Sequence, residues 1–340
     1  MSQLQLSLFQ HIKSALPANL SMADEVADIL NVSIDSAYRR IRGEKQLSFE
    51  EIQKLSDRFG ISVDKILSLK SDSILFSGDF INSENFNFLK YLDNIYSNIQ
   101  HMTSFEQKEL FYFSKDIPIY YYCMFPELAA FKFFAWMKTL LQFPDYAIPK
   151  FSMEKVDAVF FEKAKKIALL SCQLPTTEIL NVEHIQTTLR QIEYYKDTDL
   201  FESKSDLDLQ YNKLEEMNDH MEKMCAAGRK FMPGQKPLSS YAPLKMYVNF
   251  FVIGGNSMVA VLNGKKMCFL LHNVINILRT HDEGFCNYTY NFVHNIITKS
   301  TQISEVGERE RTIFFNLTRQ SINLNKQNEI KTIVKLTPYY

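Results

Sequence analysis

Residues 22–45 constrain the fold more than any other part of the chain. This segment, MADEVADILNVSIDSAYRRIRGEK, encodes two short helices joined by a tight turn. Ser21 is a favourable N-cap residue, and Asp24 and Glu25 lie where acidic side chains stabilise the first turn of a helix. Asn31 tolerates the left-handed conformation that ends such a helix. The pattern therefore predicts a helix-turn-helix.

The second predicted helix begins after Ser33 and has two different faces. Ile34, Ala37 and Ile41 follow the spacing of one inward face. The residues that we expect to point outward are Asp35, Ser36, Arg39 and Arg40. Small hydroxyl side chains can approach base edges, and arginine can reach guanine or phosphate. The outward face is therefore typical of a helix that recognises DNA.

Several further residues around these helices form a recurring pattern. They are Val26-Ala27, Leu30, Val32-Ser33, Arg39, Arg42-Gly43, Leu47-Ser48-Phe49-Glu50 and Phe59-Gly60-Ile61-Ser62-Val63-Asp64. With this pattern, residues 4–69 resemble the lambda-repressor-like (XRE-type) helix-turn-helix domain of bacterial transcription regulators. The sequence departs from that family at Asn31, where glycine is usual, at Arg40, where an apolar residue is common, and at Ile41, where glutamate is frequent. These departures leave open a rotation of the recognition helix by one residue.

The resemblance implies that the second helix enters the major groove of double-stranded DNA. Ser33, Ser36 and Arg39 would then face base edges. The residues expected at the DNA backbone or at flanking bases are Tyr38, Arg40, Arg42 and Lys45.

The charge of this region indicates weak binding by a single copy. Residues 1–70 hold nine Lys or Arg and nine Asp or Glu, and only the segment Arg39–Lys45 is locally positive. Neutralisation of phosphates supplies much of the affinity for DNA. We therefore expect a homodimer that reads two half-sites.

The composition of the whole chain is that of an ordered, soluble protein of two or three domains. It has 340 residues, 46% hydrophobic content, a net charge of −1, 10 Gly and 10 Pro. The start of the chain lacks the pattern of a secretion signal. Its five cysteines are odd in number and none are spaced as CxxC, which favours unpaired thiols in a reducing compartment. We expect a cytoplasmic protein.

The predicted fold is mainly α-helical and is divided along the chain. The segments are a helix-turn-helix bundle at 1–70, a linker at 71–82, a helical domain at 83–230 and a small α+β unit at 240–330. The last two are separate domains or pack together as one regulatory body.

Residues 83–228 show helical periodicity throughout. The predicted helices cover 86–101, 105–115, 127–143, 153–172, 178–196 and 206–227. The apolar segment 127–143 is not expected to span a membrane, because Lys132 and Lys138 interrupt it and prolines bracket it. The 15 aromatic residues between 105 and 151 either fill the core or line a ligand pocket or a dimer face.

An apolar stripe at residues 207–224 has two interpretations. Leu207, Leu214, Met217, Met221 and Met224 recur at seven-, three- and four-residue steps. This stripe forms either a short coiled-coil seam between two copies of the chain or a packing surface within its own domain.

The pattern changes to short β-branched and aromatic runs after residue 243. Gly254-Gly255-Asn256 and Asn263-Gly264 separate three such runs, and Asn-Gly is a strong hairpin signal. We therefore expect a three-stranded antiparallel meander at 246–271. Helices are predicted at 272–279, 283–299 and 305–326.

The sequence shows none of the strong catalytic, nucleotide-binding or zinc motifs. The nearest cluster is His272, His281, Asp282, Cys286 and His294, whose spacing fits no metal pattern. We therefore expect no enzyme activity, no metal and no cofactor. The predicted function is a sequence-specific transcription regulator whose C-terminal region dimerises and can sense a small-molecule or protein effector.

Two other classes of protein remain open. The helix-turn-helix could serve as a docking module in a protein-interaction scaffold. Alternatively, the C-terminal body could be an enzyme, in which case ionisable side chains should converge near His272, His281 and Asp282.

Overall fold

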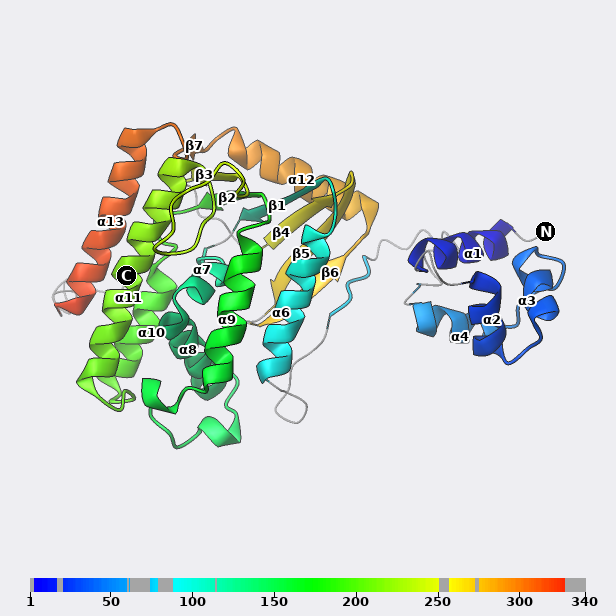
Figure 1. Cartoon of the computed structure of the whole chain (residues 1–340), viewed down its shortest axis with the longest axis horizontal. Coiled ribbons are helices and arrows are strands. Elements are labelled where there is room, and N and C mark those ends of the chain that lie inside the picture. Colours follow the sequence, from blue (N-terminus) through cyan, green and yellow to red (C-terminus); the bar gives the residue numbers. More distant parts are fainter. Residues whose placement is uncertain are drawn as a thin grey trace, which may run out of the picture. The chain divides into compact units, whose positions relative to one another are not determined.

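The computed structural model divides the chain into two compact units, Met1–Ser73 and Ile74–Tyr340 (Figure 1). The residues that it describes are 3–16, 21–59, 61, 74–78, 88–113, 115–250, 257–272 and 275–327.

The first unit is a small helical bundle. Its described helices are α1 (Gln3–Ala15), α2 (Met22–Leu30), α3 (Ile34–Ile41) and α4 (Phe49–Phe59). Their inner faces meet in one apolar core, in which Ile12, Val26, Ala37 and Leu55 are fully buried. The predicted helix-turn-helix is confirmed as α2 and α3.

The second unit is mostly helical, as predicted, but it is built on a sheet. Its described α-helices are α6 (Phe88–Thr103), α7 (Ile119–Met124), α8 (Pro126–Ala135), α9 (Ala158–Ser171), α10 (Gln186–Asp197), α11 (Lys204–Ala227), α12 (Glu283–Ile297) and α13 (Glu308–Lys326). A π-helical turn, η1 (Trp136–Leu140), continues α8, and the 3-10 turns η2 (Pro144–Tyr146) and η3 (Met153–Lys155) follow it. Among the described residues, no helix is both long enough and apolar enough to cross a membrane.

The strands of the second unit form one mixed sheet. They are β1 (Lys108–Phe113), β2 (Thr176–Leu180), β3 (Leu244–Val248), β4 (Ser257–Leu262), β5 (Lys265–His272), β6 (Asn276–Thr280) and β7 (Thr301–Gln302). The order across the described sheet is β6-β5-β4-β1-β2-β3-β7. Strands β1, β2 and β3 are parallel neighbours, and the other pairs are antiparallel. The regions predicted as a helical domain and an α+β unit thus contribute strands to the same sheet.

Three helix predictions were wrong where the chain forms strands. Residues 105–115 contain β1, residues 178–196 begin with β2 before α10, and residues 272–279 contain most of β6. All five residues of β2 are buried, and so are residues on both faces of β1. A strand covered on both faces has no alternation of apolar and polar residues, so periodicity does not reveal it.

The three-stranded meander was also wrong, although one of its hairpins is confirmed. Strands β4 and β5 pair through a turn in which Asn263 and Gly264 have φ angles of 46° and 79°. The neighbour of β4 on its other side is β1, whereas β3 pairs with β2 and β7. Residues 254–256, which were predicted to connect the first two strands, and residues 251–253, the predicted end of the first strand, lie outside the described residues.

The two faces of the sheet pack against separate apolar cores. Leu110 and Leu180 pack into the large core shared with α6–α11 and α13. Their strand neighbours Phe111 and Ile179 point the other way, into the smaller core under α12. Residues 74–78, which lie within the predicted linker, belong to this unit, and the Ser77 amide donates to the Arg279 carbonyl (2.8 Å).

The stripe on α11 is used within the chain. Leu214, Met217, Met221 and Met224 have at most 1% of their surface exposed and lie in the large core. Of its two interpretations, packing within its own domain is the one that the structure shows. Most of the aromatic residues between 105 and 151 belong to the same core.

Two glycines provide a test of how closely the backbone before α13 packs against its neighbours. Gly307, with φ of 68°, precedes α13, and a Cβ atom there would collide with the Gln302 carbonyl oxygen. Gly234, with φ of 79°, has open space around its Cα. We predict that Gly234→Ala costs about 1 kcal/mol of unfolding free energy, whereas Gly307→Ala costs about 2–4 kcal/mol because the backbone must also move. Equal losses in denaturant unfolding would contradict this placement of α13.

Candidate nucleic-acid interface

The turn between α2 and α3 is fixed by the caps that the sequence predicts. The Ser21 hydroxyl accepts from the Asp24 amide at the start of α2, and Asn31 ends that helix in the left-handed conformation with φ of 54°. The Ser33 hydroxyl accepts from the Ser36 amide (3.3 Å) at the start of α3. These bonds satisfy backbone groups at the helix ends, so the direction in which α3 leaves the turn is set locally.

Arg40 lies inside the domain, not on its outer face as the sequence pattern suggested. Only 3% of its surface is exposed. Its guanidinium group donates to the Glu51 carboxylate through Nε (3.1 and 3.2 Å) and through Nη2 (2.5 Å). Its Nη1 donates to the hydroxyl (2.5 Å) and carbonyl (3.2 Å) oxygens of Ser36. Arg40 therefore connects α3 to α4, and its charge is neutralised by Glu51.

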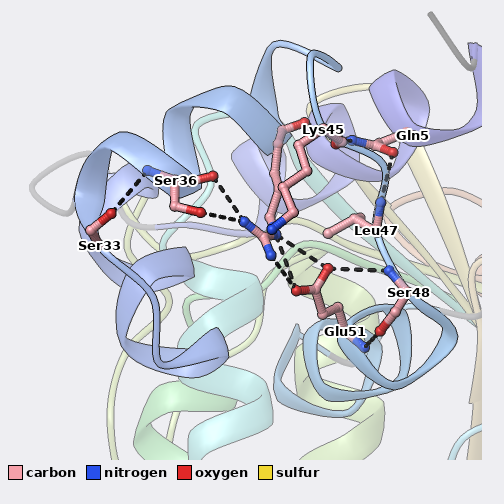
Figure 2. A network of polar contacts seen from close by, with 8 residues as sticks. Gln5, Ser33, Ser36, Lys45, Leu47, Ser48 and Glu51 are labelled. Atoms are coloured by element: carbon pink, nitrogen blue, oxygen red, sulfur yellow. Dashed lines mark hydrogen bonds and ion pairs between the residues drawn. The ribbon is translucent and has the colours of Figure 1, made fainter.

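Glu51 serves two purposes at once, as Figure 2 shows. It accepts from the Ser48 amide (3.1 Å), while the Ser48 hydroxyl accepts from the Glu51 amide (3.2 Å). This reciprocal pair is a capping box at the start of α4. Because the same carboxylate also binds Arg40, the start of α4 and the middle of α3 are held in one arrangement.

Gln5 of α1 braces the C-terminal end of α3 and the loop after it (Figure 2). Its amide nitrogen donates to the carbonyls of Arg40 (2.7 Å) and Lys45 (2.8 Å), and its amide oxygen accepts from the Leu47 backbone (3.2 Å). All three partners belong to the end of α3 or to the loop after it. A single buried side chain thus fixes the path of residues 45–47.

The exposed residues among the predicted DNA contacts on α3 and in the loop after it are Tyr38, Arg39, Arg42 and Lys45. Arg42 forms an ion pair with Glu44 (3.1 Å). Arg39 and Lys45 form no side-chain hydrogen bond or ion pair with any residue that the structure describes. These two cations are therefore available to an external anion. The positive surface is smaller than the sequence suggested, since Arg40 does not contribute to it.

The remaining residues of the predicted interface lie at the start of α3. Ser33 is exposed, and Ser36 is half-buried with its hydroxyl engaged by Arg40. Ile34 was predicted to face inward, but 52% of its surface is exposed, because it is the first residue of the helix. Ala37 is fully buried and Ile41 packs against the same core, as predicted.

The ion pair changes the acid–base behaviour of Glu51. Its hydrogen bonds from Arg40 lower the pKa of the carboxyl below its ordinary value of 4.5, against an opposing contribution from burial. The carboxylate therefore stays charged at neutral pH, which the neighbouring guanidinium requires.

The alternative site in the C-terminal region does not bring its candidates together. Asp282 is the N-cap of α12 and accepts from the Phe285 amide (2.8 Å), while His272 ends β5 and His294 lies in the last turn of α12. Cys286 is buried under the sheet. No group of three or more potential metal ligands occurs among the described residues.

Comparison with known proteins supports the assignment of the first unit. Residues 11–79 match the BetR domain. This is a helix-turn-helix-type DNA-binding domain of regulators, and the match covers about a fifth of the chain. The BetR match includes all of α2, α3 and α4. No curated protein and no solved structure matches the chain significantly.

Two positioning residues of the first unit, Glu51 and Gln5, were missed from sequence. Glu51 could have been found, because Ser48 and Glu51 have capping-box spacing and Arg40 occupies a position where an apolar residue is common. Gln5 gave no local signal, since its bonds reach residues 35 to 42 positions away.

The Arg40–Glu51 pair predicts a pH-dependent stability of the first unit. A carboxyl with a lowered pKa in the folded state stabilises the fold above its ordinary pKa, and this stabilisation is lost as pH falls through the lowered value. We predict that Glu51→Gln costs roughly 1–3 kcal/mol at neutral pH and that its deficit shrinks in acid below about pH 4.5.

The measurement is urea unfolding followed by the NMR methyl signals of Ala37 and Leu55, from about pH 7 to about pH 3. Asp57→Asn, which neutralises an exposed carboxylate of the same helix, is the control. A Glu51→Gln deficit that does not change with pH would show that the carboxylate charge is not what stabilises the pair.

Proposed function

We propose that this protein is a sequence-specific DNA-binding transcription regulator of bacterial type, in which α3 enters the major groove as in lambda-repressor-like domains. The observation that carries the proposal is which side chains of α3 and its following loop are exposed and which are paired. Arg39 and Lys45 are exposed and form no side-chain ion pair with described residues. Arg40 and Glu51 join α3 to α4, and Gln5 binds the Arg40 carbonyl at the end of α3. A preorganised helix with one available cation on its outer face and a second in the loop after it suits recognition of a polyanion with fixed geometry.

The proposed contacts follow from exposure and from the chemistry of each side chain. Ser33 and Arg39 lie toward base edges, where hydroxyl and guanidinium groups distinguish bases. Ser36, which the sequence also assigned to a base edge, is half-buried, and its hydroxyl accepts from Arg40 (2.5 Å). The residues at the DNA backbone or at flanking bases are Tyr38, Arg42 and Lys45. Arg40 acts through α3 and does not touch DNA, because it is buried and paired with Glu51.

The second unit would supply dimerisation and sensing. A domain without net charge gains too little from phosphate contacts to bind tightly as one copy, so two copies on two half-sites are proposed. An effector, either a small molecule or a protein, would act by favouring one spacing of the two DNA-binding units, which requires different affinities for the two arrangements. In this proposal the protein acts in the cytoplasm and neither unit is an enzyme.

Substitutions at Arg39 and Lys45 should distinguish contacts to bases from contacts to the DNA backbone. We predict that Arg39→Ala weakens binding to a selected duplex by about 1–3 kcal/mol without changing stability, and that Lys45→Ala weakens all sequences alike and lowers the salt slope by about 1. Fluorescence anisotropy at several salt concentrations measures both effects.

Lys13→Ala is the control for the anisotropy experiment, since it removes an equal charge at an exposed side chain in the last turn of α1. Full DNA binding by the Arg39→Ala, Lys45→Ala double variant would rule out α3 as the recognition helix and would favour a protein-docking role.

Dimeric binding makes a geometric prediction. Selection from randomised duplexes should enrich a palindrome whose half-sites lie about one helical turn, ~10 base pairs, apart or a multiple of it. Two chains per duplex are expected by sedimentation. Enrichment of a single half-site bound by one chain would contradict the dimer.

A further inference from the structure

The second unit contains a cavity of about 400 Å³ between α8, η1 and α9. Its deep wall is formed by Ala130, Phe133, Met137, Phe151 and Phe160, each of which is buried. The volume is in the range of cavities that hold small molecules, and such cavities are lined mainly by apolar and aromatic side chains. These residues belong to the aromatic-rich segment that the sequence left open between core and ligand pocket.

The charged groups at the mouth of the cavity are largely committed to one another. Lys150 pairs with Asp199 (2.7 Å), Lys155 pairs with Glu202 (2.9 Å), and the Asp157 carboxylate caps α9 by accepting from the Val159 amide (2.9 Å). Asp145 adds an exposed carboxylate at the rim. An anionic ligand would therefore find no uncommitted cation among these lining residues and would meet the Asp145 carboxylate.

One polar group inside the cavity is uncommitted. Ser152 is buried and lines the cavity, and its hydroxyl forms no hydrogen bond with any described residue. A hydroxyl that lines a cavity without a protein partner is left to bond water, and a ligand that displaces this water must replace the bond. A ligand with one donor or acceptor group could supply that partner.

The wall of the cavity includes an unusual helical turn. Met137 of the π-helical turn η1 lines this cavity, while Thr139 and Leu140 of the same turn line a second cavity of about 290 Å³. Such π-helical turns are rare and occur frequently at functional sites. The turn η1 thus contributes side chains to both cavities.

We propose that the 400 Å³ cavity is a binding site for a small uncharged molecule with an apolar, ring-containing body and one hydrogen-bonding group that meets Ser152. The claim that this cavity is the effector site of a regulator rests on the function proposed above. Binding itself does not depend on that function.

The chain carries its own reporter for this site. Trp136 is the one tryptophan in the sequence, and its ring lies 5.0 Å from the ring of Phe133, centre to centre, in an edge-to-face arrangement. Because Phe133 lines the cavity, a bound aromatic molecule should change the emission of Trp136.

The test uses two probes that differ in one group, N-phenyl-naphthylamine and its sulfonated analogue anilinonaphthalene sulfonate. The full-length protein is titrated with each, and probe and Trp136 emission are followed. We expect the uncharged probe to bind in a saturable manner, and at least about tenfold more tightly than the anion. Preference for the anion, or no saturable binding of the uncharged probe, would overturn the proposal.

Three variants locate the site. Ala130→Leu adds bulk to the deep wall and should weaken the uncharged probe at least about tenfold, whereas Ser152→Ala leaves the wall intact and should weaken it about threefold to tenfold. Ile148→Ala, at an exposed side chain that does not line the cavity, is the control and should bind normally. Unchanged affinity in the Ser152→Ala variant would overturn the proposed hydrogen bond, and unchanged affinity in both variants would overturn the site.

DNA binding is measured in the same samples with and without the uncharged probe, so that the two proposals fail separately. Probe binding that is lost in the Ala130→Leu variant supports the site even if the protein binds no DNA. DNA binding without any probe binding supports the proposed regulator and rules out this effector site.

Discussion

The contact between the Arg40 guanidinium and the Glu51 carboxylate is the interaction on which the proposed DNA-binding surface depends. It connects α3 to the capping box of α4, and Gln5 binds the carbonyls of Arg40 and Lys45 at the end of α3 and in the loop after it. A buried ion pair adds little net stability by comparison with apolar packing, but loss of one partner is costly. Such a pair therefore fixes one geometry, which a helix that must match DNA requires.

The local features of the first unit were predictable because neighbouring residues determine them. Ser21, Asn31 and Ser33 form the caps that their side chains favour, and Ala37 is buried as its spacing indicates. The orientation of Arg40 was not predictable from helical periodicity. Its guanidinium group can be buried only because Glu51, eleven residues away, supplies a compensating charge, and that placement depends on how α3 and α4 pack.

The sheet of the second unit escaped prediction for a related reason. Strand β2 contains Thr176, Thr177 and Glu178, all buried, and the Glu178 carboxylate accepts from the hydroxyls of Tyr120 (2.5 Å) and Tyr121 (2.8 Å). A carboxylate inside a sheet is stable only with such partners, which arrive from a helix far along the chain. The Asn263-Gly264 hairpin was predictable because its turn is encoded by two adjacent residues.

The most direct test of the central contact is a reciprocal exchange of its two charges, with DNA affinity measured by anisotropy. Arg40→Glu and Glu51→Arg each place two like charges together, so each variant should bind DNA at least about tenfold more weakly. The double variant restores opposite charges and should regain a clear part of the lost affinity. Wild-type affinity in either single variant, or a double variant no better than the singles, would contradict the role given to this ion pair.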